Sequence, residues 1–575
     1  MKKLAIFSII WFLLLPLYVP AQEAKKNISL LLYNGKIFTA DERYSMAEAV
    51  AVNGERIVEV GSSDELRAKY KADREIDLEG RLVTPGFNDA HIHFVSVGLA
   101  LLRVDLVGSK TLEEARQRIA AKIRELPKGA WVLGRGWDHT LWNNRLPTRQ
   151  DLDEIAPENP VFVQRVDGHI AWANSLALKM AGVTRGTKAP EGGEIVLDEK
   201  GEPSGILKET AQGLVNRVVP PPTDEEKLKG IRLALEQAKK YGLTSAQGGT
   251  DYDAVPLYRE LLEKDELTVR VAVWQNFEAP IETLEKQRED FLALKLDPSR
   301  LKLGILKGYM DGTLGSRTAA MLAPFADDPG NSGIPRKAEE ELIKMIVERD
   351  KAGFQIGLHA IGDKANRTAL DGFEKAKIQR DENTEKDGFI ASSIRDLDRF
   401  TNPRHRIEHA QVVHPADFKR FAGLGVIASM QPTHAITDKR WAPERLGEYR
   451  VLGAYAWHTF QANNVHIAFG TDAPVESLNT YLTLYAAVTR QSTDGDPAGG
   501  WLPQERLSIE QAIRSYTYES AYAEFAEREK GTIRTGMLAD MVVHSQDLLT
   551  IEPKEILTTE PVYTIFNGRV IYEKK

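Results

Sequence analysis

Eight short apolar runs, separated by helix-like stretches, dominate the central part of this 575-residue chain. Each run has the length of a buried strand, and stretches such as 224–241 and 338–351 have the periodicity of helices. The runs are 81–89, 244–248, 270–275, 303–308, 355–359, 405–409, 427–431 and 466–470. Eight strand–helix units close a TIM (β/α)8 barrel, so we predict an α/β chain with such a barrel over residues 84–534.

A long stretch separates the first apolar run from the second. We interpret residues 101–222 as a large insertion after barrel strand 1, because strand candidates of its own occur at 131–136 and 161–166. We expect this insertion to cover the mouth of the barrel as a lid. A second stretch, 377–402, is strongly polar and is predicted to be a surface excursion.

Both ends of the chain are rich in strand patterns. The predicted strands are 28–33, 36–39, 49–52, 56–60, 540–544 and 564–572. An Asn-Gly pair, which favours two-residue hairpins, follows or interrupts three of them, at Asn34, Asn53 and Asn567. We therefore predict one β-sandwich domain built from residues 22–83 and 535–575. Two unrelated small β units are the alternative.

The first residues resemble an export signal. Lysines at positions 2 and 3 precede an apolar stretch over residues 4–19, and Val19-Pro20-Ala21 matches a cleavage site before Gln22. The stretch is shorter than the ~20 residues that cross a bilayer, which disfavours the alternative of a membrane anchor. We predict a signal peptide over residues 1–21, a periplasmic or secreted protein, and no membrane attachment after cleavage.

Composition excludes several functions. The chain has no cysteine, which excludes disulfides, thiolate zinc sites and a cysteine nucleophile. The formal net charge is −8 without a basic stripe, so nucleic acid is a poor candidate partner. We expect a small-molecule substrate, and a homo-oligomer is compatible with the sequence.

Six side chains of metal-binding type follow the predicted strands. His91 and His93 come after the first strand, and residues two apart in an extended segment point the same way and can hold one cation. The others are Lys307, His359 and His409, at the ends of strands four, five and six, and Asp472, after strand eight. Because the carboxyl ends of barrel strands meet at one face, we expect the six to lie together.

The segments that carry these residues resemble a known family. They are TPGFNDAHIHF, LKGYMDGTLGSRTAAM, GLHAIGDKAN, RHRIEHAQ and FGTDAPV, between residues 84 and 475. Together they resemble the amidohydrolase superfamily, and most closely its amidohydrolase family 3 branch, which includes N-substituted formamide deformylase-like proteins. The resemblance implies hydrolysis of a non-peptide C–N bond through metal-activated hydroxide.

The same resemblance implies a role for each of the six residues. His91, His93 and Asp472 would bind one divalent metal ion, His359 and His409 a second, both zinc. Lys307 would be carboxylated and would bridge the two ions, because carboxylation turns a cationic amine into an anionic oxygen donor. Asp472 would also act as general base and then acid, or else as a metal ligand only. An ordinary ion pair of Lys307 with Asp311 is the alternative to carboxylation.

Five further residues are candidates for substrate contact. His434 follows strand seven and is a candidate catalytic residue that contacts the oxyanion, or else a surface histidine. Asp311 and Arg317 lie on the loop after strand four, where an Arg can bind a carboxylate or remain solvated. Trp142 and His169 belong to polar-aromatic segments of the insertion, which either face the substrate or form a core of their own.

Two other functions remain open from the sequence. One is a mononuclear deaminase or cyclic amidase of the same superfamily, with an unmodified Lys307. The other is an exported ligand-binding protein that kept the barrel without turnover. The number of metal ions per chain distinguishes the mononuclear enzyme from a two-metal hydrolase. Hydrolysis of any amide excludes the ligand-binding protein.

Overall fold

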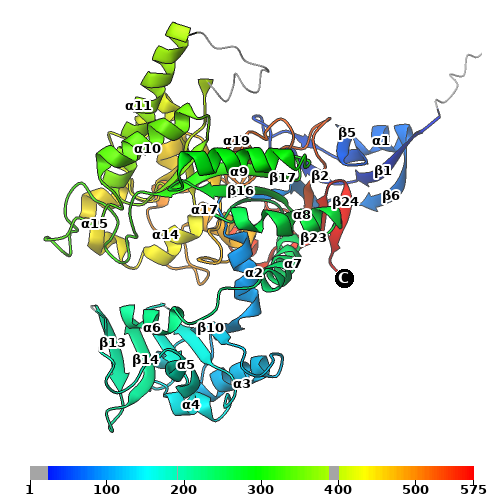
Figure 1. Cartoon of the computed structure of the whole chain (residues 1–575). Coiled ribbons are helices and arrows are strands. Elements are labelled where there is room, and N and C mark those ends of the chain that lie inside the picture. Colours follow the sequence, from blue (N-terminus) through cyan, green and yellow to red (C-terminus); the bar gives the residue numbers. More distant parts are fainter. Residues whose placement is uncertain (1–23, 167, 191, 388–400) are drawn as a thin grey trace, which may run out of the picture.

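The computed structural model describes residues 24–166, 168–190, 192–387 and 401–575 (Figure 1). The predicted signal peptide lies outside these residues, as does most of the second half of the polar stretch 377–402. Within the described part of the chain, no helix combines the length and the apolar character needed to cross a bilayer.

A sheet of eight parallel strands forms the centre of the molecule and confirms the predicted TIM barrel. In chain order the strands are β8 (Phe87–Asp89), β15 (Leu243–Gly248), β16 (Arg270–Asn276), β17 (Leu301–Tyr309), β18 (Ile356–Ala360), β19 (Arg406–His409), β20 (Ile427–Met430) and β21 (Ile467–Phe469). The last strand returns to the first, where the Ala90 N–H donates to the Phe469 carbonyl over 2.9 Å. Each predicted run therefore contributes one strand to the barrel.

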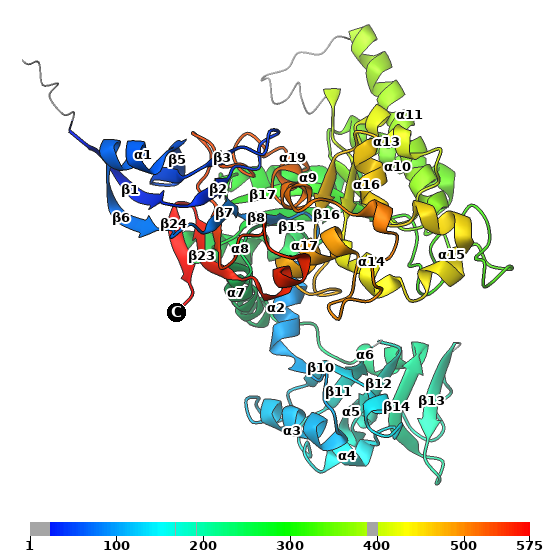
Figure 2. The ribbon, with the colours of Figure 1, turned by 180° about the vertical axis from the view of Figure 1, so that it is seen from behind.

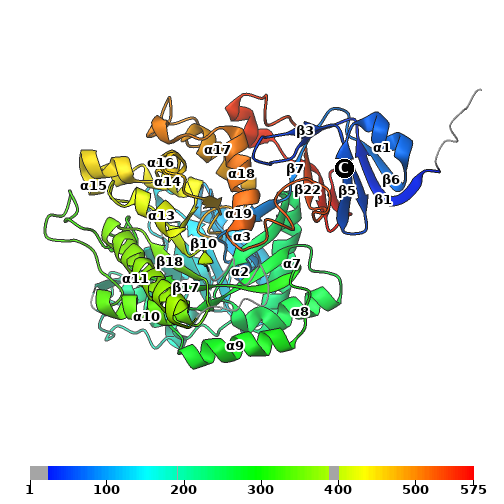
Figure 3. The ribbon, with the colours of Figure 1, turned by 90° about the horizontal axis from the view of Figure 1, so that it is seen from above.

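Helices surround the strands on the outside (Figure 3). They are α7 (Asp224–Lys240), α8 (Val255–Glu263), α9 (Ile281–Ala293), α10 (Glu339–Lys351), α11 (Asp363–Asp387), α13 (Phe418–Leu424), α14 (Pro432–Asp438), α15 (Ala442–Arg450), α16 (Trp457–Ala462), α17 (Thr480–Thr489), α18 (Ile509–Ser515) and α19 (Tyr518–Tyr522). Thr223 and Glu226 form a capping box that starts α7, which buries Ile231 and Leu235 against the barrel. The first part of the stretch 377–402 extends α11.

The first apolar run differs from the prediction, because it divides into two strands. β7 (Leu82–Pro85) belongs to a terminal sheet, and only β8 belongs to the barrel. Gly86 separates them, and a Cβ at this position would lie 2.2 Å from Thr244 Oγ1. A glycine is therefore required where the chain crosses closely from one sheet to the other. The boundary predicted at residue 84 falls inside β7.

Two sheets from the chain ends pack face to face beside the barrel (Figure 2). One contains β1 (Lys26–Tyr33), β4 (Ala49–Asn53), β5 (Arg56–Gly61) and β6 (Tyr70–Asp77), and the other β2 (Lys36–Phe38), β3 (Met46–Ala47), β7, β22 (Met541–His544), β23 (Pro561–Phe566) and β24 (Arg569–Glu573). Helix α1 (Ser63–Lys69) joins β5 to β6. Leu32 and Val52 of the first sheet share a core with Val83 and Val543 of the second. The second sheet combines strands from both ends of the chain.

One predicted hairpin is wrong and two are confirmed. β1 pairs with β4 and β6, whereas β2 pairs with β3 and β7, so the strands around Asn34-Gly35 lie in different sheets. A Cβ on Gly35 would lie 2.3 Å from Leu78 Cδ1, so this glycine provides close packing where the chain changes sheet. β4–β5 and β23–β24 are antiparallel pairs, and Asn567 and Gly568 have φ values of 53° and 74° at the second turn.

The insertion forms a lobe with its own six-stranded sheet, attached to one side of the barrel (Figures 1 and 2). Its strands are β9 (Val104–Asp105), β10 (Val132–Trp137), β11 (Val161–Arg165), β12 (Ile170–Ala173), β13 (Gly193–Leu197) and β14 (Pro203–Glu209), and its helices are α3 (Leu112–Ile123), α4 (Arg149–Asp153), α5 (Ser175–Met180) and α6 (Gly213–Asn216). Helix α2 (Phe94–Leu102) leads into the lobe directly after His93. Arg135 Nη1 donates to the Pro474 carbonyl over 3.4 Å, so the lobe contacts the loop after β21.

A buried histidine makes the stability of this fold depend on pH. His544 is fully buried, with Nε2 2.9 Å from Thr84 Oγ1 and Nδ1 2.9 Å from the Tyr481 hydroxyl. Burial lowers its pKa to about 3. Below about pH 6.5 the unfolded chain binds a proton at this position and the folded chain does not. The free energy of unfolding therefore decreases as the pH is lowered. We expect this group to make the free energy of unfolding about 2 kcal/mol smaller at about pH 5 than at neutral pH.

The control is His544→Gln, which has no titrating group at this position. Urea denaturation at about pH 7.5 and about pH 5 should show a larger loss of unfolding free energy for the wild type than for the variant. Equal losses in both proteins would contradict the assignment to His544.

Candidate metal centre

Three of the predicted ligands meet at the carboxyl ends of β8 and β21. His93 Nε2 lies 3.1 Å from Asp472 Oδ1, and His91 Nε2 lies 3.5 Å from the same oxygen. One ligand atom from each of the three residues lies within 4.8 Å of the others. Two imidazoles and a carboxylate at this spacing are a donor set that suits zinc and similar ions.

His359 and His409, from β18 and β19, lie beside this group. Their ring centroids are 4.6 Å apart, and the His409 ring is 4.8 Å from that of His91. His359 Nε2 donates to the Gly312 carbonyl over 3.0 Å, and His409 Nδ1 donates to Gln431 Oε1 over 2.7 Å. Since both partners are acceptors, they fix the tautomer and leave His359 Nδ1 and His409 Nε2 with a lone pair for a metal ion.

Glu408 orients His91 in the same way. His91 Nδ1 donates to Glu408 Oε2 over 2.6 Å, and Arg406 holds the other carboxylate oxygen at 2.8 Å. Burial alone would raise the pKa of Glu408, but Arg406 and His91 lower it well below its usual value. Burial lowers the pKa of His91 to about 4. His91 is therefore a neutral imidazole at neutral pH, with Nε2 available as a ligand.

Lys307 is buried in the middle of these ligands. Its Nζ lies 3.4 Å from His91 Nε2 and near the rings of Trp274 and Tyr309, and it forms no ion pair with any described residue. Burial lowers its pKa to about 8. An amine without a counter-ion among metal-binding side chains fits a group that becomes an anionic ligand.

The alternative of a Lys307–Asp311 ion pair is wrong. Asp311 is completely buried and accepts hydrogen bonds from the backbone N–H groups of Ala320, Ile361 and Gly362 at 2.8, 3.1 and 2.8 Å. Its carboxylate therefore organises the loops after β17 and β18. Asp311 Oδ1 also lies 3.6 Å from His359 Nε2, and contact of Asp311 with substrate stays a prediction.

Asp472 connects the two groups of ligands with His434. The other carboxylate oxygen, Oδ2, lies 3.7 Å from His434 Nε2, and the His434 ring stacks on that of His409. His434 Nε2 is buried and has no hydrogen-bond partner among the described residues. Burial acts to raise the pKa of Asp472, but the surrounding histidines lower it well below its usual value. Asp472 is thus a carboxylate, and His434 presents an unsatisfied polar atom to the centre.

The backbone at two of these positions is strained. His409 and Asp472 have φ values of 74° and 56°, which non-glycine residues rarely adopt. Each lies just at or after the end of its strand, where this conformation turns the side chain toward the barrel axis. Such strain persists only where the surrounding structure holds it, as it commonly does at functional sites.

Three other predicted substrate contacts lie elsewhere. Arg317 forms a two-point ion pair with Asp327 on its own loop, at 2.8 and 3.2 Å, and its contact with a substrate carboxylate stays a prediction. Trp142 packs with Trp137 and Trp172 in the core of the lobe, as in the alternative that these aromatics form a core of their own. His169 is exposed and lies 3.0 Å from Glu209 on the lobe surface. Its contact with substrate stays a prediction.

Three residues that shape the centre were not predicted from the sequence: Glu408, Gln431 and Trp274. Glu408 had a usable signal, because it alternates with Arg406 in a predicted barrel strand, so both side chains point to the same face. Gln431 and Trp274 had none, since their roles depend on how neighbouring strands are placed.

Comparisons with known proteins cover the whole architecture. A family profile described as the amidohydrolase family matches residues 74–572. Protein LONG AFTER FAR-RED 3 of Arabidopsis thaliana is 34% identical, over 94% of this chain and 91% of the relative. N-substituted formamide deformylase of Arthrobacter pascens is 26% identical, over 95% of this chain and 98% of the relative.

A solved structure is similar along nearly its full length. An uncharacterized metal-dependent hydrolase from Pyrococcus horikoshii superimposes with a TM-score of 0.73 at 28% identity, over 91% of this chain and 99% of that chain. The similarity therefore extends over sandwich, barrel and lobe together.

Proposed function

This chain belongs to the amidohydrolase family, and we propose that it is a metal-dependent hydrolase that cleaves the C–N bond of a small amide. The main observation in favour is the convergence of six ligand side chains at one end of the barrel. Three of the histidines among them each use one ring nitrogen for a protein acceptor and keep the other for a metal ion.

The donor set fits two divalent ions. His91, His93 and Asp472 would hold one, and His359 and His409 the other, with a carboxylated Lys307 between them. The imidazole and carboxylate donors suit zinc. When bound, such ions supply a Lewis acid that polarises a carbonyl and lowers the pKa of water.

Two side chains of the chain itself would handle the substrate. Asp472 is a carboxylate with Oδ1 toward His93 and Oδ2 toward His434, so it would take the proton of the attacking water and pass it to the leaving nitrogen. His434 Nε2 lacks a protein partner and would hydrogen-bond the substrate carbonyl or its leaving group.

The named relative suggests the first substrates to test. Purified protein, prepared with zinc, should be incubated with N-substituted formamides, acetamides, cyclic amides and aminated heterocycles. We expect release of a carboxylic acid and an amine from at least one open-chain amide. Ammonia from a heterocycle, or ring opening alone, would favour the mononuclear deaminase or cyclic amidase. No turnover on any substrate, in protein that retains metal, would favour a ligand-binding role.

We also propose that the protein is exported. The apolar stretch over residues 4–19 is too short to anchor the chain, and Val19 and Ala21 suit signal peptidase. Expression of the full-length chain in a bacterial host should give a periplasmic protein that begins at Gln22. N-terminal sequencing that reads Met1 in the mature protein would contradict the proposal.

A further inference from the structure

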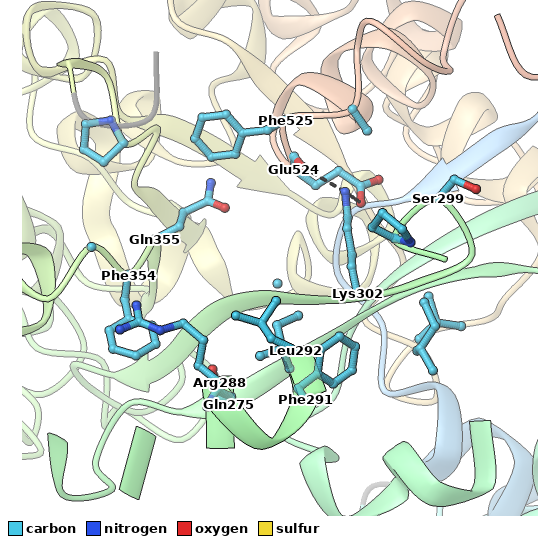
Figure 4. Close-up of a pocket in the computed structure, with 18 of the residues that line it drawn as sticks. Gln275, Arg288, Phe291, Leu292, Ser299, Lys302, Phe354, Gln355, Glu524 and Phe525 are labelled. Carbon is cyan, nitrogen blue, oxygen red and sulfur yellow. Dashed lines mark hydrogen bonds and ion pairs between the residues drawn. The ribbon is translucent and has the colours of Figure 1, made fainter. Parts of the chain in front are cut away.

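A cavity of about 720 Å³ lies at the end of the barrel opposite the metal centre. It is lined by the first residues of β16 and β17 and by Gln355, which precedes β18 (Figure 4). Lys302 in its wall and Lys307 in the metal centre are five residues apart on β17, which is about 17 Å along a strand. The volume is within the range of small-molecule sites, roughly 300–1,000 Å³, and this cavity is separate from the catalytic centre.

Much of the wall is apolar. Phe291 and Leu292 of α9 form one side together with Phe354, and Phe525 lies across the open space from them in Figure 4. The Leu292 side chain is unusually accessible for a leucine, at 67% exposure. An apolar wall of this kind favours a ligand with an apolar body, because burial of both surfaces removes them from water.

The charged groups of the wall fall into two sets. Three acids line the cavity: Glu524 receives Lys302 and Lys530 at 2.7 Å each, Asp350 is paired with Arg380, and the third is Glu529. The wall contains more cationic side chains than acidic ones.

Three of those cations remain without an acid. Arg288, Lys295 and Lys351 line the cavity, and none of them forms an ion pair with a residue in the described ranges. Arg288 stacks at 4.2 Å over the Phe354 ring, which places its charge beside the apolar wall. Arg288 also donates from Nη1 to the Ala352 carbonyl over 2.9 Å, so the rim carries positive charge that meets backbone but no carboxylate in the described ion pairs.

We propose that this cavity binds a small amphipathic anion, with an apolar body against Phe291, Leu292 and Phe354 and its charged head at Arg288, Lys295 and Lys351. The cationic rim discriminates against a neutral molecule of the same shape, and the apolar wall discriminates against a small inorganic anion. The site is distinct from the metal centre, so the proposal holds whatever reaction the metal centre performs.

Calorimetric titration of the metal-loaded protein tests the site, with octanoate as the probe and 1-octanol as its neutral counterpart. We expect saturable binding of octanoate, weaker binding of octanol, and affinity that rises about fourfold per methylene from hexanoate to decanoate. Absence of saturable octanoate binding would overturn the proposal.

Variants locate the binding. Lys295→Glu with Lys351→Glu changes two exposed side chains and should weaken octanoate binding at least about tenfold. The matched control is Lys110→Glu with Lys179→Glu, which changes the net charge equally on the distant lobe and should leave affinity unchanged. Leu292→Gln changes an exposed position, preserves the charge and should weaken octanoate binding. If the double variant does not fold, Leu292→Gln alone tests whether octanoate binds in this cavity. Octanoate affinity that is unchanged in both rim variants would place binding elsewhere, such as at the metal centre, and would refute the proposal.

Discussion

Replacing Asp472 with Asn is expected to lower kcat/KM by about 10³-fold or more while the barrel stays folded. Asp472 is the carboxylate shared by His91, His93 and His434, and Asn cannot accept the proton of the attacking water. Asn keeps the size of the side chain and one oxygen, so the effect falls on the chemistry more than on packing. Steady-state kinetics with circular dichroism and metal analysis measures each part.

A matched control lies on the same rim of the barrel. Asp311→Asn makes the same chemical change at a buried carboxylate that accepts three backbone hydrogen bonds. It should lower the free energy of unfolding by about 1–3 kcal/mol and leave most of the turnover at low temperature. An Asp472→Asn protein that keeps a tenth of the wild-type rate would remove Asp472 from the proton transfer.

Replacing Lys307 with Ala is expected to empty at least one metal position and to abolish turnover. Lys307 Nζ lies 3.4 Å from His91 Nε2 without a counter-ion, so its proposed carboxylated form would supply oxygens that no other described side chain replaces. Small carboxylic acids such as acetate or propionate should partly restore metal content and activity, because they supply the missing oxygens. Metal analysis with and without added acid measures this rescue.

Two other variants separate carboxylation from charge. Lys307→Arg keeps the cation but cannot be carboxylated, so it should behave like Lys307→Ala. Lys302→Ala removes a lysine from the same strand at its other end, where it pairs with Glu524, and should lower stability without loss of metal. Full metal occupancy in Lys307→Ala would refute the bridging role.

The barrel was predictable because eight short strand-like runs alternate with helix-like stretches. Its ligands were predictable for a related reason, since a side chain at the end of such a run must lie on one rim. His91, Lys307 and His409 needed no knowledge of their neighbours to be placed there. The barrel and the position of six candidate ligands on its rim were therefore predicted from local sequence, whereas their roles as metal ligands were implied by the family resemblance.

The features that could not be predicted from the sequence also share a physical cause. The Asn34-Gly35 pair has the composition of a hairpin turn, but Gly35 is needed for close packing against Leu78, which sequence spacing cannot show. Asp311 accepts hydrogen bonds from the backbone and Trp142 packs against other tryptophans, and neither contact can be inferred from the motifs that contain these residues. Contacts between distant segments decided these positions, and no local pattern records them.

The central claim is that two metal ions share this centre through a modified Lys307. A crystal structure of the wild-type protein, with data collected above and below the zinc absorption edge, tests it most directly. We predict two anomalous peaks, one at His91, His93 and Asp472 and one at His359 and His409, with continuous density from Lys307 Nζ to both. A single peak, with density that ends at a bare Lys307 amine, would contradict the claim.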